Sequence, residues 1–168
     1  MRTLVIGAVG GFAVAVVALG AVLVFTRDAK APRLTEADYR AALERWEQHG
    51  PKSYDLDLEL SGSRPGTVHV EVRAGEVTHM VRDGVEPTQR RTWYYWSVPG
   101  MFDTIGEELE MARDPAVSFH NPSASQMVMW AEFDAALGYP RRYDRVVLGA
   151  DFEVHWRVTH FMAIQEKN

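Results

Sequence analysis

The stretch that decides the fold runs from Tyr54 to Val81 and reads YDLDLELSGSRPGTVHVEVRAGEVTHMV. Apolar and polar residues alternate in three segments of it, and this period of two is typical of strands with one buried face and one wet face. The segments are separated by SGSRPG at residues 61–66 and by Ala74-Gly75, which are turn sequences. We therefore predict a meander of three antiparallel strands.

Helix signals flank this meander. Thr35 is expected to cap a helix that ends at Gly50-Pro51, and Ser97 a second helix that ends at Asp114-Pro115. Further strands are predicted at residues 127–133, 143–148 and 152–161, with a short strand candidate at 117–120. Runs of strands set apart from helices are typical of α+β domains. The expected domain has two helices packed on an antiparallel sheet, in the order α-β-β-β-α-β-β-β.

Residues 4–25 contain no charged side chain. As a helix they would span roughly 33 Å, and the hydrocarbon core of a bilayer is about 30 Å thick. We expect an uncleaved transmembrane signal-anchor over residues 1–27 rather than a cleaved secretory signal, then a linker over 28–34 and one soluble α+β domain over 35–164. The predicted fold class therefore begins with a transmembrane helix, and residues 4–25 make the membrane an expected partner. The expected location is the cell membrane, as a single-pass protein with its domain outside the cytoplasm.

Charge and cysteine content exclude several classes of function. Residues 34–168 contain 14 Lys and Arg against 22 Asp and Glu, a net charge of −8. A domain this acidic is not expected to bind nucleic acid. The chain has no cysteine, which excludes disulfides, thiolate nucleophiles, zinc–thiolate sites and a lipid-anchor cysteine.

Six histidines raise the question of a metal site. If Ala74-Gly75 is a two-residue turn, His69 and His79 are predicted to lie on opposite faces of the sheet, with His79 in the core. His155 and His160 likewise differ in parity along one strand. Neither pair could then share a metal ion, so no metal and no other cofactor is expected.

The best binding candidate is the aromatic block WYYW at residues 93–96, which two arginines precede closely. Exposed rings offer stacking area to sugars or to an apolar partner, and arginine adds hydrogen-bond donors. The competing interpretation places alternate rings of the block in the core. Tyr139, between Gly138 and Pro140, is a further candidate, with an ordinary turn as its alternative. The candidate ligand-binding residues are Arg91, Trp93, Tyr94, Trp96 and Tyr139.

Four short motifs carry a resemblance that covers about residues 39–161. They are Trp46, Ser53-Tyr54, MFDTI at residues 101–105, and Phe133-Asp134 followed by LGYP at 137–140. In these motifs the chain resembles a bacterial family of unknown function whose members are exported and often lipid-anchored. The resemblance implies an extracytoplasmic domain and no particular activity. The anchor cysteine and the cysteine pair of that family are absent here, so the membrane helix would have to replace the lipid anchor.

The sequence contains no motif that sets a nucleophile beside a base, and no glycine-rich phosphate loop. The predicted function is a membrane-tethered, non-catalytic binding or interaction module. Two alternatives remain open: an accessory subunit of a membrane-protein partner, and a hydrolase whose carboxylates meet only in the fold. A binding module predicts a concave aromatic surface with Trp93 or Trp96 and no buried charged pair, and an accessory subunit predicts a flat apolar patch. A hydrolase predicts a cleft where two carboxylates or an Asp–His pair converge.

Overall fold

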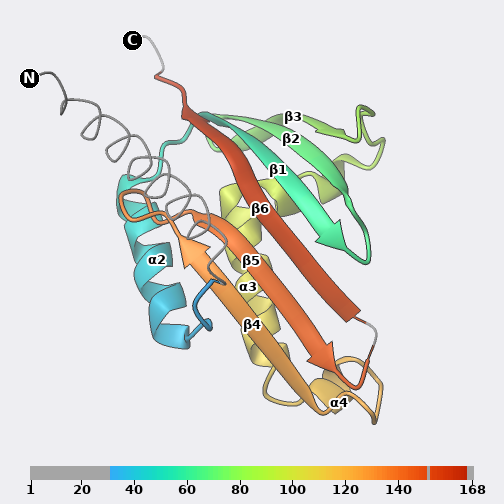
Figure 1. The fold of residues 1–168 in the computed structure, drawn as a ribbon. Coiled ribbons are helices and arrows are strands. Elements are labelled where there is room, and N and C mark those ends of the chain that lie inside the picture. Colours follow the sequence, from blue (N-terminus) through green and yellow to red (C-terminus); the bar gives the residue numbers. More distant parts are fainter. Residues whose placement is uncertain (1–30, 151, 166–168) are drawn as a thin grey trace, which may run out of the picture. The chain divides into compact units, whose positions relative to one another are not determined.

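The computed structural model describes residues 31–150 and 152–165, which form an α+β domain on one six-stranded sheet (Figure 1). Neighbouring strands are antiparallel throughout, in the order β3-β2-β1-β6-β5-β4. The first and last strands of the chain therefore pair at the centre of the sheet. The strands are β1 Tyr54–Gly62, β2 Gly66–Arg73, β3 Glu76–Arg82, β4 Gln126–Phe133, β5 Pro140–Leu148 and β6 Phe152–Ala163.

Two main helices pack on one face of this sheet. α2 (Glu36–His49) begins where Thr35 Oγ1 accepts a hydrogen bond from the Asp38 N–H at 3.1 Å, and it ends at Gly50, as predicted. α3 (Val98–Met111) begins at Ser97, whose Oγ accepts from the Gly100 N–H at 3.2 Å. Each cap contributes about 1 kcal/mol because it satisfies a donor that the first turn of a helix leaves free.

The core lies between these helices and the inner face of the sheet. Leu56 and Leu58 of β1 are buried, and they pair in register with Val70 and Val68 of β2, which are buried as well. Ile105 on α3 is also fully buried in this core. Burying one such side chain stabilises the fold by roughly 1.5–3 kcal/mol. The alternation predicted for the first two strands of the meander is confirmed by this burial pattern.

Aromatic rings join α2 to the sheet. Trp46 lies edge-on to Tyr54 with ring centroids 5.6 Å apart, and Tyr54 stacks on Phe161 of β6 at 5.3 Å. Tyr139 stacks on Phe161 at 4.3 Å. Glycine is required at position 138, because φ of Gly138 is +87° and a Cβ would lie 2.3 Å from a backbone carbonyl oxygen of α2. Trp46, Tyr54 and the LGYP motif therefore have a packing role.

The predicted fold class is wrong in its first element. No helix within residues 31–150 and 152–165 is long and apolar enough to cross a membrane. The transmembrane helix predicted over residues 4–25, like the anchor boundary at residue 27, lies outside the described residues. What the structure supports is the α+β domain with its six-stranded antiparallel sheet.

Residues 31–34, the described part of the linker predicted over residues 28–34, lie against the sheet. The Leu34 N–H donates to the Met129 carbonyl at 2.9 Å, and the Ala131 N–H donates to the Pro32 carbonyl at 3.1 Å. This segment therefore lies along the outer edge of β4, and Leu34 is buried. The compact unit that contains the domain begins at Ala31.

The strand candidate at residues 117–120 is a single turn of helix instead. α4 (Pro115–Ser118) begins at Asp114, whose Oδ1 accepts from the Val117 N–H at 3.2 Å. Pro115 suits the first helical turn, where its missing N–H leaves no hydrogen bond unmade. Local capping therefore outweighs the β-propensity of Val117 and Phe119.

Candidate functional site

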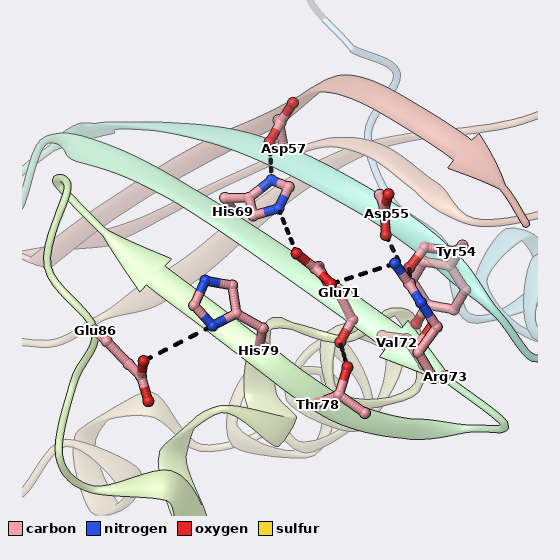
Figure 2. Close-up of polar contacts among 10 residues, drawn as sticks. All are labelled: Tyr54, Asp55, Asp57, His69, Glu71, Val72, Arg73, Thr78, His79 and Glu86. Carbon is pink, nitrogen blue, oxygen red and sulfur yellow. Dashed lines mark hydrogen bonds and ion pairs between the residues drawn. The ribbon is translucent and has the colours of Figure 1, made fainter.

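The outer face of the sheet carries the polar residues of the alternating strands, and many of them form acid–base pairs (Figure 2). His69 Nδ1 lies 2.6 Å from Asp57 Oδ1, and His69 Nε2 lies 3.7 Å from Glu71 Oε1. Arg73 pairs with Asp55 at 2.7 Å and with Glu71 at 3.3 Å. The hydrogen bond that His69 donates to the Asp57 carboxylate is the main cause of the raised pKa of His69. Asp55 and Asp57 of β1 are therefore paired with basic residues of β2 on this face.

His79 also lies on the outer face, so its predicted place in the core is wrong (Figure 2). The predicted two-residue turn is present, and β2 and β3 start to pair in the register that it requires. The register then shifts between Glu71 and Val72, so that His79 rather than Thr78 lies opposite Glu71. This β-bulge moves every later residue of β3 by one position. His69 and His79 consequently share a face, with ring centroids 6.5 Å apart.

A second bulge changes the parity of β6. The register with β1 shifts between Asp57 and Leu58, which places His160 opposite Asp57. His155 lies opposite Asp144 of β5, with its Nδ1 2.9 Å from Asp144 Oδ1. Both imidazoles therefore lie on the outer face, and the predicted opposite placement is wrong. In the part of the chain that the structure describes, no group of three or more His, Asp or Glu side chains is placed to hold a metal ion.

The aromatic block forms tight 3₁₀ turns, η2 (Arg90–Thr92) and η3 (Tyr94–Trp96), so its rings do not alternate as they would in a strand. Trp93 is 3% exposed, and its Nε1 donates to the Pro87 carbonyl at 3.1 Å. The exposed Tyr94 hydroxyl donates to Asp103 at 2.6 Å, which raises the pKa of Tyr94 to about 12. Trp93 is therefore a core residue, whereas Tyr94 faces solvent.

The five candidate binding residues do not form one site. Arg91 and Tyr94 are exposed, and Trp93 is buried. Tyr139 belongs to the aromatic cluster that joins α2 to the sheet. Trp96, in contrast, is half-buried and borders a pocket.

This Trp96 pocket has a volume of about 510 Å³. The β1–β2 turn, the end of β3, β5 and the start of β6 contribute to its walls, and η3 adds Trp96. Small-molecule sites in proteins commonly measure roughly 300–1,000 Å³. The charged and aromatic residues that line the pocket are Arg64, Arg82, Trp96, Arg145, Phe152, Glu153 and His155.

Arg145 is a buried charge at the wall of this pocket, with 8% of its surface exposed. Its Nη1 lies 3.1 Å from Oε1 of Glu108 on α3, and the Tyr143 hydroxyl donates to Oε2 of the same carboxylate. Burial raises the pKa of Glu108, and Arg145 opposes that rise. The Arg145 Nε is buried and has no hydrogen-bond partner among residues 31–150 and 152–165. A buried charged pair thus borders the pocket, contrary to the expectation stated for a binding module.

Ser61, His155 and Asp144 form a row across three neighbouring strands beside the pocket. Their order matches the nucleophile, base and orienting acid of hydrolases, and the Asp144–His155 hydrogen bond is present. His155 Nε2, however, lies 3.6 Å from Glu153 Oε2, and within the described ranges no hydrogen bond joins His155 to Ser61. The row therefore lacks the contact between nucleophile and base.

Residues 38–163, from the first turn of α2 to the end of β6, match a known protein family. The chain belongs to DUF6174, a family of unknown function. No curated protein and no solved structure matches it. The match confirms that the chain resembles a family of unknown function. Export and lipid anchoring of DUF6174 proteins stay predictions.

The pocket arginines of this DUF6174 domain were not predicted from the sequence. Arg145 lies between Tyr143 and Val147 at the buried positions of β5. A charged residue in the apolar phase of a predicted strand is unusual, so the sequence did contain a signal for Arg145. Arg64 and Arg82 belong to a turn and to the end of a strand. Nothing in the sequence indicates that either lies near Trp96.

Proposed function

We propose that this DUF6174 domain is a non-catalytic binding module whose ligand occupies the Trp96 pocket. The observation that carries the proposal is that Trp96, Phe152 and Arg145 border one cavity of about 510 Å³. Small-molecule sites combine ring surface with a few well-placed polar groups in cavities of this size. The pocket has both components, and its buried guanidinium is held in place by contacts behind it.

A binding module was expected to lack a buried charged pair, but the Arg145–Glu108 pair suits a binding role better than a stabilising one. Bringing two charges out of water costs several kcal/mol, and their mutual attraction often does no more than offset that cost. The unpartnered Arg145 Nε adds the cost of a buried donor without an acceptor. Apolar residues at both positions would stabilise the fold at least as well. The pair does, however, hold a guanidinium at the pocket wall.

Ring surface supports the same role. Phe152 is 51% exposed although it is large and apolar, and it stacks on Phe119 with ring centroids 5.6 Å apart. Trp96 is half-buried at the same pocket. Exposed rings in a hollow provide stacking area for a ligand at little cost in side-chain entropy.

Binding can be followed by NMR through the indole N–H signals of the five tryptophans. We would titrate the nitrogen-15-labelled full-length chain with indole, indole-3-acetate and tryptamine, which share one ring system. At least one of these compounds should shift the Trp96 signal, which W96F assigns by its loss. The Trp130 signal, from a residue of β4 that does not line the Trp96 pocket, is the internal control and should stay in place. If none of the compounds shifts the Trp96 signal at millimolar concentration, the proposal is rejected.

The row of Ser61, His155 and Asp144 favours hydrolysis of esters or amides as a second candidate function. Ser61 would attack the carbonyl carbon, and His155 would take its proton after turning away from Glu153. His155 would then give that proton to the alcohol or amine that leaves as the ester or amide bond breaks, and a water molecule would hydrolyse the acyl-serine. The test is hydrolysis of p-nitrophenyl acetate by the full chain, S61A and S63A, because both serines line the same pocket. Activity that S61A abolishes and S63A retains would support hydrolysis. Equal background rates in all three chains would reject it.

An extracytoplasmic location is proposed with either function, on the support of the sequence resemblance alone. Protease added to intact cells tests this location. Digestion of the domain would support it, and protection of the domain until the cells are lysed would reject it.

A further inference from the structure

We infer that the ligand of the Trp96 pocket is an anion, a carboxylate, sulfonate or phosphate, attached to a flat apolar body. The inference rests on the proposed function, because it assigns a ligand chemistry to the same pocket. Three arginines and one glutamate line the pocket, in a domain whose residues 34–168 carry a net charge of −8. The pocket thus opposes the charge of the domain around it, which favours an anionic ligand there.

Two of the arginines are available to an anion. Arg64 is exposed in the β1–β2 turn and makes no ion pair with the described part of the chain. The Arg82 Nε lies 3.7 Å from the Asp83 carboxylate, beyond hydrogen-bond distance. That carboxylate accepts a hydrogen bond from the Thr67 N–H at 2.8 Å instead. A guanidinium offers five N–H donors in one plane, which match the oxygens of a carboxylate or phosphate.

The third arginine of the pocket already has a carboxylate partner, and Glu153 is the one acid among the lining residues. Glu108 neutralises Arg145 at 3.1 Å, so Arg145 adds a fixed donor and no net charge. The Glu153 carboxylate lies 3.6 Å from His155 Nε2. Arg64 and Arg82 are therefore the two lining arginines whose guanidinium groups an anion can approach.

The flat body of the ligand follows from the position of the rings. The Arg82 guanidinium lies over the Trp96 ring, 5.8 Å from its centroid. A planar ligand that stacks beside Trp96 would therefore place an acidic substituent next to Arg82. Phe152 supplies a second ring at the same cavity.

A second pocket, on the helix side of the sheet, has the opposite balance of charges. It has a volume of about 360 Å³ and is bordered by α2, α3 and β1. Its charged lining residues are Glu47, Lys52 and Asp103, so acids outnumber bases there, as in the whole domain. The charge of this second pocket therefore disfavours an anion, whereas basic residues outnumber acidic ones in the lining of the Trp96 pocket.

The three indole compounds test the anionic ligand separately from binding itself, because they share one ring system and differ in the charge of the substituent. Indole-3-acetate is an anion, indole is neutral and tryptamine is a cation. We expect indole-3-acetate to bind about tenfold more tightly than indole, since a charge-assisted hydrogen bond contributes roughly that factor, and tryptamine to bind most weakly. The preference should narrow as salt concentration rises, because at least one of the arginines is exposed.

Arginine variants test which side chains meet the anion. R64Q and R82Q should each remove most of the preference for indole-3-acetate over indole. R113Q is the matched control, because Arg113 is exposed on the surface and pairs with Glu110 at 2.9 Å. It should leave the preference unchanged. R82Q also loses the contact with Trp96, so R64Q, in an exposed turn, keeps the test decisive if R82Q folds poorly.

The outcomes distinguish the two claims. Equal affinity for all three indoles, or a preference that R64Q leaves intact, would overturn the anionic ligand while the binding module stands. An unmoved Trp96 signal with all three compounds would overturn both. A tenfold preference that R64Q reduces and R113Q does not would support both.

Discussion

Replacing Arg145 with Met should destabilise the domain by about 3 kcal/mol at pH 8. The substitution keeps an unbranched side chain but removes the partner of Glu108, whose side chain is 12% exposed. A buried charge that loses its partner costs about 3–5 kcal/mol. The lower end applies because Glu108 keeps the hydrogen bond from Tyr143. For a domain of this size the melting temperature should fall by roughly 10 °C.

The loss caused by R145M should shrink in acid. Burial already raises the pKa of Glu108, and removal of the guanidinium raises it further. A carboxyl group with a raised folded pKa contributes stability below its unfolded pKa, and this contribution is lost as the pH rises through the folded pKa. The variant has the higher folded pKa and therefore gains more on acidification than the parent chain. The difference between them should fall as the pH approaches 4.5, the ordinary pKa of a glutamate.

Urea unfolding at pH 8 and pH 5 measures this loss. The double variant E108Q/R145M should recover most of it, because neither charge is then left alone. R113M is the matched control, since it breaks the exposed Arg113–Glu110 pair and should cost less than about 0.5 kcal/mol. The reasoning would be refuted if R145M cost no more than R113M, or cost the same at both pH values.

Three further results are expected. H69Q should lower the free energy of unfolding by less than about 1 kcal/mol. The raised pKa of His69 means that this stability is present below pH 6.5, the ordinary pKa of a histidine, and is lost as the pH rises through the folded pKa. Urea midpoints at pH 5.5 and pH 8.5 measure the difference. G138A should cost more than about 2 kcal/mol by thermal melting, because its Cβ would meet a carbonyl oxygen, whereas G84A has open space and only backbone strain. W93A should cost about 3–5 kcal/mol as a buried ring, and W96A clearly less; the opposite order would place Trp96 in the core.

Features with a local cause could be predicted from the sequence. Thr35 and Ser97 cap their helices through hydrogen bonds to residues three positions later, so the signal and its effect lie within one turn. The alternation in β1 is equally local, because it depends on the pleat of the strand alone. The same local chemistry, however, turned residues 115–118 into a helix against their β-propensity.

The faces of the histidines could not be predicted, because one extra residue in a strand reverses the parity of everything beyond it. Thr78 is such a residue, and its hydroxyl donates to the Glu71 carbonyl at 3.2 Å across the bulge. A threonine in a strand does not by itself predict a β-bulge. His79 and His160 both moved to the other face of the sheet for this reason.

The Trp96 pocket could not be predicted because its parts meet only through long-range pairing. Arg64, Arg82 and Arg145 come from separate segments, and they meet because the first and last strands of the chain pair at the centre of the sheet. The aromatic block at residues 93–96 was predicted to contain binding residues, and only part of it lies at the pocket. Trp96 reaches the pocket, whereas Trp93 turns into the core because the chain coils there instead of extending.

The short segment that lies along β4 bears on how the domain behaves when the chain is shortened. The bridge at Arg33 and Trp130 occupies hydrogen-bonding groups that an uncovered outer strand would offer to other molecules. A chain trimmed to start at residue 35 would lose that shield, together with the buried Leu34. Such a fragment should self-associate edge to edge and precipitate at concentrations where a chain that retains residues 31–34 stays monodisperse.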